Sequence, residues 1–303
     1  MKRASLRLFA CFSGIVAGAT MFAACGGDSA EKSDAKLQVL ATTVQIGALA
    51  QQVAGDHADV RVLVKTGVDP HDYELSTGDL RAIERASIIL RHGIGLDSYL
   101  DKAASDASTR AKTIVVTEGI KLRVENGEQD PHVWQDPVNV KTMTSNIAGA
   151  LAAKDPASAE TYRKNADAYL ATLDSVDRQI GELIDSIPPP NRKMVTNHDA
   201  FGYFIERYGL QFVGAVIPSL STQAEPSAKD IAALEDTIRR EKVRAIFAES
   251  SLEPKTAAQI AKDTGVRIVD DLYGDSLGPP GSGADTVDGM LLANARKIAE
   301  ALR

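Results

Sequence analysis

Short runs of β-branched residues recur along the chain and alternate with segments whose apolar residues follow helical spacing. In one such segment, Ile231, Leu234 and Ile238 lie three and four positions apart, shortly before an apolar run. Strands that alternate with helices form parallel sheets covered by those helices. The pattern therefore predicts an α/β protein with two similar lobes, each a four-stranded parallel sheet with flanking helices. The expected strands are 37–43, 60–66, 86–92 and 113–118, then 193–198, 211–217, 243–249 and 266–272.

A long helical stripe separates the two sets of strands, over residues 155–190. Asp155 and Pro156 are typical of a helix start, and three prolines at 188–190 end the pattern. About 30 helical residues span roughly 45 Å, enough to run along both lobes. A solvated coiled-coil arm is the alternative, but α/β sequence on both sides favours a rigid linking helix between lobes at 37–154 and 191–303. Its expected apolar positions are Tyr162, Ala166, Tyr169, Leu173, Val176, Ile180, Leu183 and Ile187.

The first 24 residues have the layout of a secretory signal peptide, with a basic start, an apolar stretch and small residues before Cys25. The apolar stretch is too short for a lasting membrane span. Residues 22–25, FAAC, resemble the lipobox of bacterial lipoproteins, although Phe22 stands where leucine is usual. We therefore expect a signal peptide at 1–24, lipidation at Cys25 and a polar tether over 25–36. The alternative is an ordinary signal peptide that is cut nearby.

The composition that remains after removal of the signal peptide limits which molecules the protein is expected to bind. Cys11 leaves with the signal peptide, so no disulfide is expected and the fold depends on its core alone. Without Lys2, Arg3 and Arg7, 31 basic residues remain against 41 acidic ones, a net charge of −10. Nucleic acid is not an expected partner, because phosphate binding needs a positive surface.

Three of the five histidines, His71, His132 and His198, fall at or after the ends of predicted strands. Ligand groups of parallel α/β proteins lie in the loops at the carboxyl ends of strands. His71 and His132 each end an Asp-Pro-His tripeptide, in which proline stiffens the backbone that presents the imidazole. The preceding aspartates can orient these loops or accept an imidazole N–H. The clustering indicates a metal site in a cleft between the lobes.

Several motifs around these histidines resemble the solute-binding lipoproteins of zinc and manganese ABC importers, the cluster A-I or family 9 binding proteins. The resemblance runs from about residue 38 to the C-terminus. It implies a bilobed fold with a rigid linking helix and one metal ion between the lobes. The motifs are VDPHDYE (68–74), DPHVWQDP (130–137), NHDAFGYF (197–204), QAEPSAKDI (223–231), AIFAESSLEPK (245–255) and LYGDSLG (272–278).

Carried over by motif, the resemblance implies the metal ligands His71, His132, His198 and Asp275. Asp275 rests on the resemblance alone, because spacing leaves other nearby aspartates open. The implied partners are ABC permease subunits with a cytoplasmic ATPase, and the protein is expected to be a monomer and not an enzyme. It would be extracytoplasmic and anchored by its lipid to a membrane, at the cell surface or in the periplasm. The aspartates left open by spacing are Asp270, Asp271 and Asp285.

The donor set favours Zn²⁺ as the cargo, because three imidazoles and one carboxylate suit a small tetrahedral site. Mn²⁺ and Fe²⁺ are the alternatives, and manganese members of the resembled family commonly carry glutamate where this chain has His198. His92 replaces a common asparagine, and we expect it to form hydrogen bonds or lie at the surface rather than bind metal. Glu249 is expected to support the site, and Trp134 to pack behind His132.

Two other functions remain open at the level of sequence. A secreted zinc-dependent hydrolase would need an open metal position and a nearby general base. Asp199 is the one tempting base, but beside a predicted helix it is more simply a cap. An adhesin or chaperone on the same fold is the third hypothesis, since a fold does not fix a function.

Overall fold

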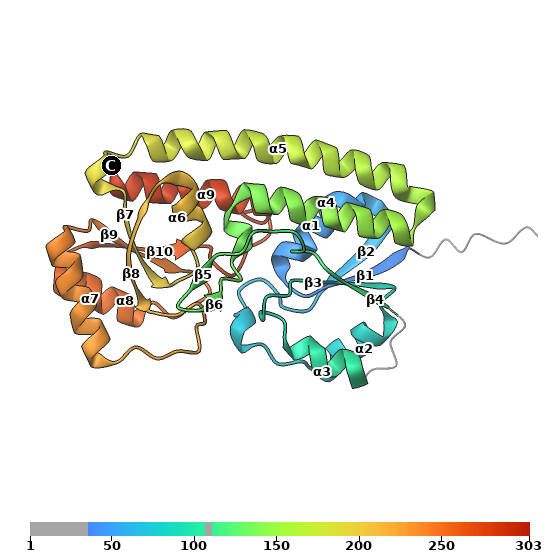
Figure 1. Cartoon of the computed structure of the whole chain (residues 1–303), viewed down its shortest axis with the longest axis horizontal. Helices are drawn as coiled ribbons and strands as arrows, with labels where there is room; N and C mark the ends of the chain where they lie inside the picture. The colour runs from blue at the N-terminus through green and yellow to red at the C-terminus, as the bar shows by residue number, and fades with distance from the viewer. Residues whose placement is uncertain (1–35, 107–110) are drawn as a thin grey trace, which may run out of the picture. The chain divides into compact units, whose positions relative to one another are not determined.

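The computed structural model describes residues 36–106 and 111–303, and Lys36–Arg303 forms one compact unit. The predicted signal peptide and Cys25 lie outside the described residues. Figure 1 shows the arrangement of the helices and strands.

The first half of the unit is a parallel sheet in the order β2-β1-β3-β4. Its strands are β1 (Leu37–Ala41), β2 (Ala58–Val62), β3 (Ile88–Arg91) and β4 (Lys112–Val115). The helices of this half are α1 (Val44–Ala54), α2 (Thr77–Arg85), α3 (Tyr99–Asp106) and α4 (Pro137–Lys154). A short antiparallel hairpin of β5 (Val124–Glu125) and β6 (Glu128–Gln129) precedes α4.

The second half repeats this topology in a parallel sheet of order β10-β9-β7-β8. Its strands are β7 (Lys193–His198), β8 (Gln211–Ile217), β9 (Ala245–Glu249) and β10 (Arg267–Leu272). Its helices are α6 (Gly202–Tyr208), α7 (Ala228–Glu241), α8 (Lys255–Thr264) and α9 (Val287–Leu302). The predicted fold class, with two similar four-stranded parallel sheets and flanking helices, is confirmed.

The linking helix α5 (Ala159–Asp185) packs against α1 and α4 of the first half and against α9 of the second (Figure 1). Tyr162, Tyr169 and Leu173 on its apolar stripe are buried in a core cluster to which both halves contribute. The helix begins later than expected, because Pro156 starts a separate 3-10 turn at Pro156–Ser158. Near its end, Ile184 is buried, whereas Leu183 is only partly buried.

Four more 3-10 turns complete the described elements: Gly55–His57, Pro70–Asp72, Val133–Gln135 and Pro189–Asn191. Two of them, Pro70–Asp72 and Val133–Gln135, lie in the loops of the predicted metal ligands. Within residues 36–106 and 111–303, no helix is both long enough and apolar enough to cross a membrane.

Candidate metal centre

The structure brings His71, His132, His198 and Asp275 together, with one potential ligand atom of each within 4.8 Å of all the others. His71 lies in the Pro70–Asp72 turn after β2, and His132 follows the β5–β6 hairpin. His198 is the last residue of β7, and Asp275 lies in the loop after β10. Within each parallel sheet, the carboxyl ends of the strands meet at one edge, and each half contributes two of the four side chains from loops at or after such an edge.

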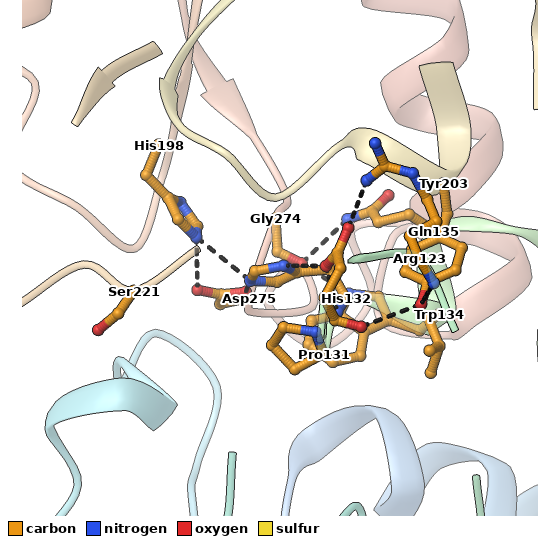
Figure 2. Close-up of polar contacts among 12 residues, drawn as sticks. Arg123, Pro131, His132, Trp134, Gln135, His198, Tyr203, Ser221, Gly274 and Asp275 are labelled. Carbon is orange, nitrogen blue, oxygen red and sulfur yellow. Dashed lines mark hydrogen bonds and ion pairs between the residues drawn. The ribbon is translucent and has the colours of Figure 1, made fainter. Parts of the chain in front are cut away.

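The donor atoms face one another at nearly equal distances. The Nε2 atom of His132 lies 3.3 Å from Nε2 of His71 and 3.3 Å from Nε2 of His198. Oδ2 of Asp275 lies 3.3 Å from Nε2 of His71 and 3.5 Å from Nε2 of His198, and Oδ1 lies 3.4 Å from Nε2 of His132. Figure 2 shows His132, His198 and Asp275 pointing toward one another.

Carboxylates orient the two deepest histidines from behind. Asp130 Oδ1 lies 2.8 Å from Nδ1 of His132, and Asp130 in turn accepts a 2.6 Å hydrogen bond from Arg123. Glu249 Oε1 lies 2.5 Å from Nδ1 of His198, at the point of the second sheet where β7 and β9 run side by side. A carboxylate on Nδ1 fixes the tautomer and leaves Nε2 free to bind a metal ion.

The loop of Asp275 is held by residues from both halves. Glu249 Oε2 accepts a 3.0 Å hydrogen bond from the backbone N–H of Asp275. Gln45 Nε2 donates a 2.9 Å hydrogen bond to the backbone carbonyl of Asp275. Trp134 donates to the carbonyl of Gly274 at 2.8 Å. A Cβ at Gly274 would lie 1.8 Å from Glu249 Oε2, so glycine is required for this close approach.

The electrostatics of the cluster favour a bound cation. Burial disfavours the charged form of His198, but the carboxylates of Glu249 and Asp275 outweigh this and raise its pKa to about 9. Burial would raise the pKa of Asp275, yet the imidazoles of His198 and His132 hold it well below its usual range. Both carboxylate oxygens of Asp275 are buried and lack a hydrogen-bond donor among the described residues. Buried charges are normally paired or coordinated to metals, so these oxygens fit a cation as their partner.

The remaining expectations from sequence have mixed outcomes. His92 is fully buried, and its Nε2 lies 2.7 Å from the carbonyl of Pro131, which confirms a hydrogen-bonding role. Burial lowers the pKa of His92 to about 4 despite the nearby carboxylate of Asp97, so its ring is neutral and donates from Nε2. The prediction that Asp199 caps a helix was wrong, because α6 begins at Gly202 with Phe201 at its N-cap.

Two supporting residues were missed by sequence reasoning. Gln45 lies in α1 and holds Asp275 from 230 positions away, and no local pattern marks it. Arg123 lies in the loop before β5, and no pattern in the sequence distinguishes it from other basic residues. Trp134 was expected to pack behind His132, and their ring centroids are 5.4 Å apart.

Comparisons with known proteins identify the family of the chain. Residues 39–301 match the family described as zinc-uptake complex component A, periplasmic. The chain is 31% identical over 306 residues to the manganese ABC transporter substrate-binding lipoprotein PsaA of Streptococcus mitis, covering 97% of each chain. It is 33% identical over 287 residues to the iron ABC transporter substrate-binding lipoprotein MtsA of Streptococcus pyogenes serotype M1, covering 91% of this chain and 92% of that one.

A solved structure shows the same fold. The periplasmic zinc-binding protein TroA from Treponema pallidum matches with a TM-score of 0.83 and 30% sequence identity, over 88% of this chain and 99% of that one. The two-lobed fold, the linking helix and the buried cluster thus define a metal-binding substrate-binding protein of an ABC importer. The chain belongs to the zinc-uptake complex component A family. The proteins of this class are transport receptors and not enzymes, which excludes the secreted hydrolase.

Proposed function

We propose that this protein captures Zn²⁺ outside the cytoplasm and delivers it to the permease of an ABC importer driven by a cytoplasmic ATPase. The ligands in this proposal are His71, His132, His198 and Asp275. The observation that carries it is the spacing of the donor atoms. Ligands about 2.0–2.1 Å from a tetrahedral zinc ion lie about 3.3 Å apart. With Oδ2 of Asp275 as the fourth donor, four separations within this set, two between imidazole nitrogens and two from Oδ2 to an imidazole nitrogen, are 3.3–3.5 Å.

The choice of Zn²⁺ over its alternatives follows from donor chemistry. Imidazole nitrogen suits zinc, whereas Mn²⁺ prefers carboxylate and water oxygens at higher coordination. Mn²⁺ or Fe²⁺ is the second candidate, because both oxygens of Asp275 face the imidazoles and can supply a fifth ligand atom. Relatives named for manganese and for iron transport add weight to this alternative.

We further propose that the mature protein begins at Cys25, after removal of residues 1–24, and that a lipid on Cys25 anchors it to a membrane. Residues 25–36 then form the tether, residues 37–154 and 191–303 the two lobes, and residues 155–190 the link between them. One chain supplies all four proposed ligands, so a monomer is sufficient for capture. If Cys25 is acylated, Cys25→Ser moves the protein from the membrane fraction to the soluble fraction.

Cell growth distinguishes the proposed cargo metals, because in vitro affinity favours zinc over manganese at almost any nitrogen-containing site. A strain that lacks the gene should grow poorly under chelation and recover on added zinc. Rescue by manganese or iron, but not by zinc, would contradict zinc as the cargo. His198→Glu replaces nitrogen by oxygen and should shift relative uptake toward manganese, with His57→Gln, at an exposed turn, as the matched control. Unchanged relative uptake would remove His198 from the proposed ligands.

A further inference from the structure

The three histidines of the cluster differ in what holds their imidazole rings. Nδ1 of His132 and Nδ1 of His198 each lie against a buried carboxylate, at 2.8 and 2.5 Å. Among the described residues, no hydrogen bond reaches Nδ1 of His71. The side chain of His71 is 9% exposed, whereas those of His132 and His198 are fully buried. His71 is therefore the least supported and most accessible histidine of the site.

His71 is instead held through the backbone of its loop. Asp69 Oδ1 accepts a 2.8 Å hydrogen bond from the His71 N–H, which shapes the Pro70–Asp72 turn. The other oxygen, Oδ2, accepts a 2.6 Å bond from the hydroxyl of Thr222. Thr222 lies between β8 and α7 in the second half of the unit, 153 positions away. One carboxylate thus ties the loop of His71 to the opposite half.

A weaker contact lies beside this one. Gln223 Nε2 is 3.3 Å from Asp72 Oδ1, and both residues are exposed. Both bonds end on a carboxylate, but the Thr222–Asp69 bond is shorter and partly buried, where water weakens it less. We therefore take the Thr222–Asp69 hydrogen bond as the main link between the loop of His71 and the second half.

The Thr222–Asp69 hydrogen bond lies beside a pocket that reaches the metal site. A pocket of about 500 Å³ is lined by His71 together with Glu128, Pro131, Ser221 and Gln223. Of the four clustered side chains, only His71 lines this pocket. An ion that leaves the cluster by this route passes His71, and the segment that carries Thr222 forms part of the wall.

We infer that Asp69 and Thr222 are positioning residues that hold His71 on the captured ion and set the rate of metal release. This inference rests on the proposed function and extends it to the control of the same site. Release requires one ligand to move first, and the ligand with the least support is His71. Loss of the Thr222 hydroxyl leaves Asp69 bonded only to its own loop, so the turn and its imidazole move away from the ion more often.

The test is the rate of zinc transfer from the loaded full-length protein to an excess of a fluorescent chelator, followed by stopped flow. Thr222→Val removes the hydroxyl at nearly constant shape, and we expect release to accelerate about tenfold. Thr222→Ser retains a hydroxyl and should release zinc close to the wild-type rate. Thr237→Val is the matched control, because the hydrogen bonds of the Thr237 hydroxyl among the described residues stay within its own helix α7, to Ala233 and from Arg240.

Each possible result of this experiment either supports or contradicts the inference. Wild-type release in Thr222→Val, or equal acceleration in Thr237→Val, would overturn it, as would fast release in Thr222→Ser. Asp69→Asn keeps the size of the side chain but removes its charge, and accelerated release is expected there too. That variant provides the decision if Thr222→Val does not fold. A wild-type protein that binds no zinc would instead refute the proposed function, before any variant is compared.

Discussion

Glu249→Gln exchanges one buried oxygen for an NH₂ group and leaves the shape of the side chain unchanged. In the wild type, both carboxylate oxygens accept hydrogen bonds, one from the His198 ring at 2.5 Å and one from the Asp275 backbone N–H at 3.0 Å. The proposed zinc ligand is Nε2 of His198, so Nδ1 must carry the proton that Glu249 accepts. The substitution therefore tests whether this carboxylate sets the tautomer of a metal ligand.

Neither orientation of the glutamine amide satisfies both neighbours. If its oxygen accepts from His198, its NH₂ faces the Asp275 N–H, and two donors meet. In the flipped orientation the NH₂ faces Nδ1 of His198, which then needs a lone pair there and a proton on Nε2, where the ion would bind. One hydrogen bond to a charged group is lost in either case, which is about 1.5–3 kcal/mol or roughly 10- to 150-fold in zinc affinity.

The assay is a competition for zinc between the purified protein and a chelating indicator of known affinity at neutral pH. Glu253→Gln is the matched control, because the side chain of Glu253 is 65% exposed and pairs only with Lys255 among the described residues. Melting of the metal-free proteins checks that both variants fold. Zinc affinity of Glu249→Gln equal to that of the control would refute the idea that this carboxylate orients His198.

Three further changes test the loop of Asp275 and an ion pair between α5 and α6. Gly274→Ala places a methyl group 1.8 Å from Glu249 Oε2, so the Asp275 loop must shift, and competition assays should show weaker zinc binding than in the wild type; equal binding would contradict this. Trp134→Phe removes the 2.8 Å hydrogen bond to the Gly274 carbonyl and should lower the free energy of unfolding in urea by about 1–2 kcal/mol; an unchanged value would contradict this. Burial opposes ionisation of Asp177, but Arg207 on α6 holds its pKa below the usual value, so Asp177 stabilises the fold above about pH 4 and loses this effect as the pH falls. Urea unfolding should show Asp177→Asn less stable than the wild type at pH 7, with a difference that shrinks at pH 3; a constant difference would refute this.

Much of the fold follows from local patterns in the sequence. Apolar runs that alternate with helical spacing predict two sets of four parallel strands, because periodicity depends on residues a few positions apart. The stripe through Tyr162, Tyr169 and Leu173 predicts the long helix for the same reason. The predicted start of this helix at Asp155 and Pro156 was wrong, because Pro156 begins a separate 3-10 turn and the α-helix starts at Ala159.

The histidines of the site are also visible in the sequence, because the ends of parallel strands are where such folds place ligands. His71, His132 and His198 follow this rule, and the Asp-Pro-His tripeptides mark two of them. The choice of Asp275 among neighbouring aspartates needed more than spacing. In the structure its carboxylate faces the imidazoles, while Asp270 and Asp271 are exposed.

Asp130 and Glu249 were expected from the sequence to support the site, but their exact contacts and the other supports were decided only by tertiary structure. Gln45 meets Asp275 across 230 positions, Glu249 meets His198 across 51, and Thr222 meets Asp69 across 153. No periodicity or tripeptide connects such pairs, since each depends on how two sheets and their loops pack around one core. Sequence alone therefore determined which elements form, where the imidazoles lie along them and the local partner Asp130 of His132, while long-range packing determined the contacts that join distant segments around the site.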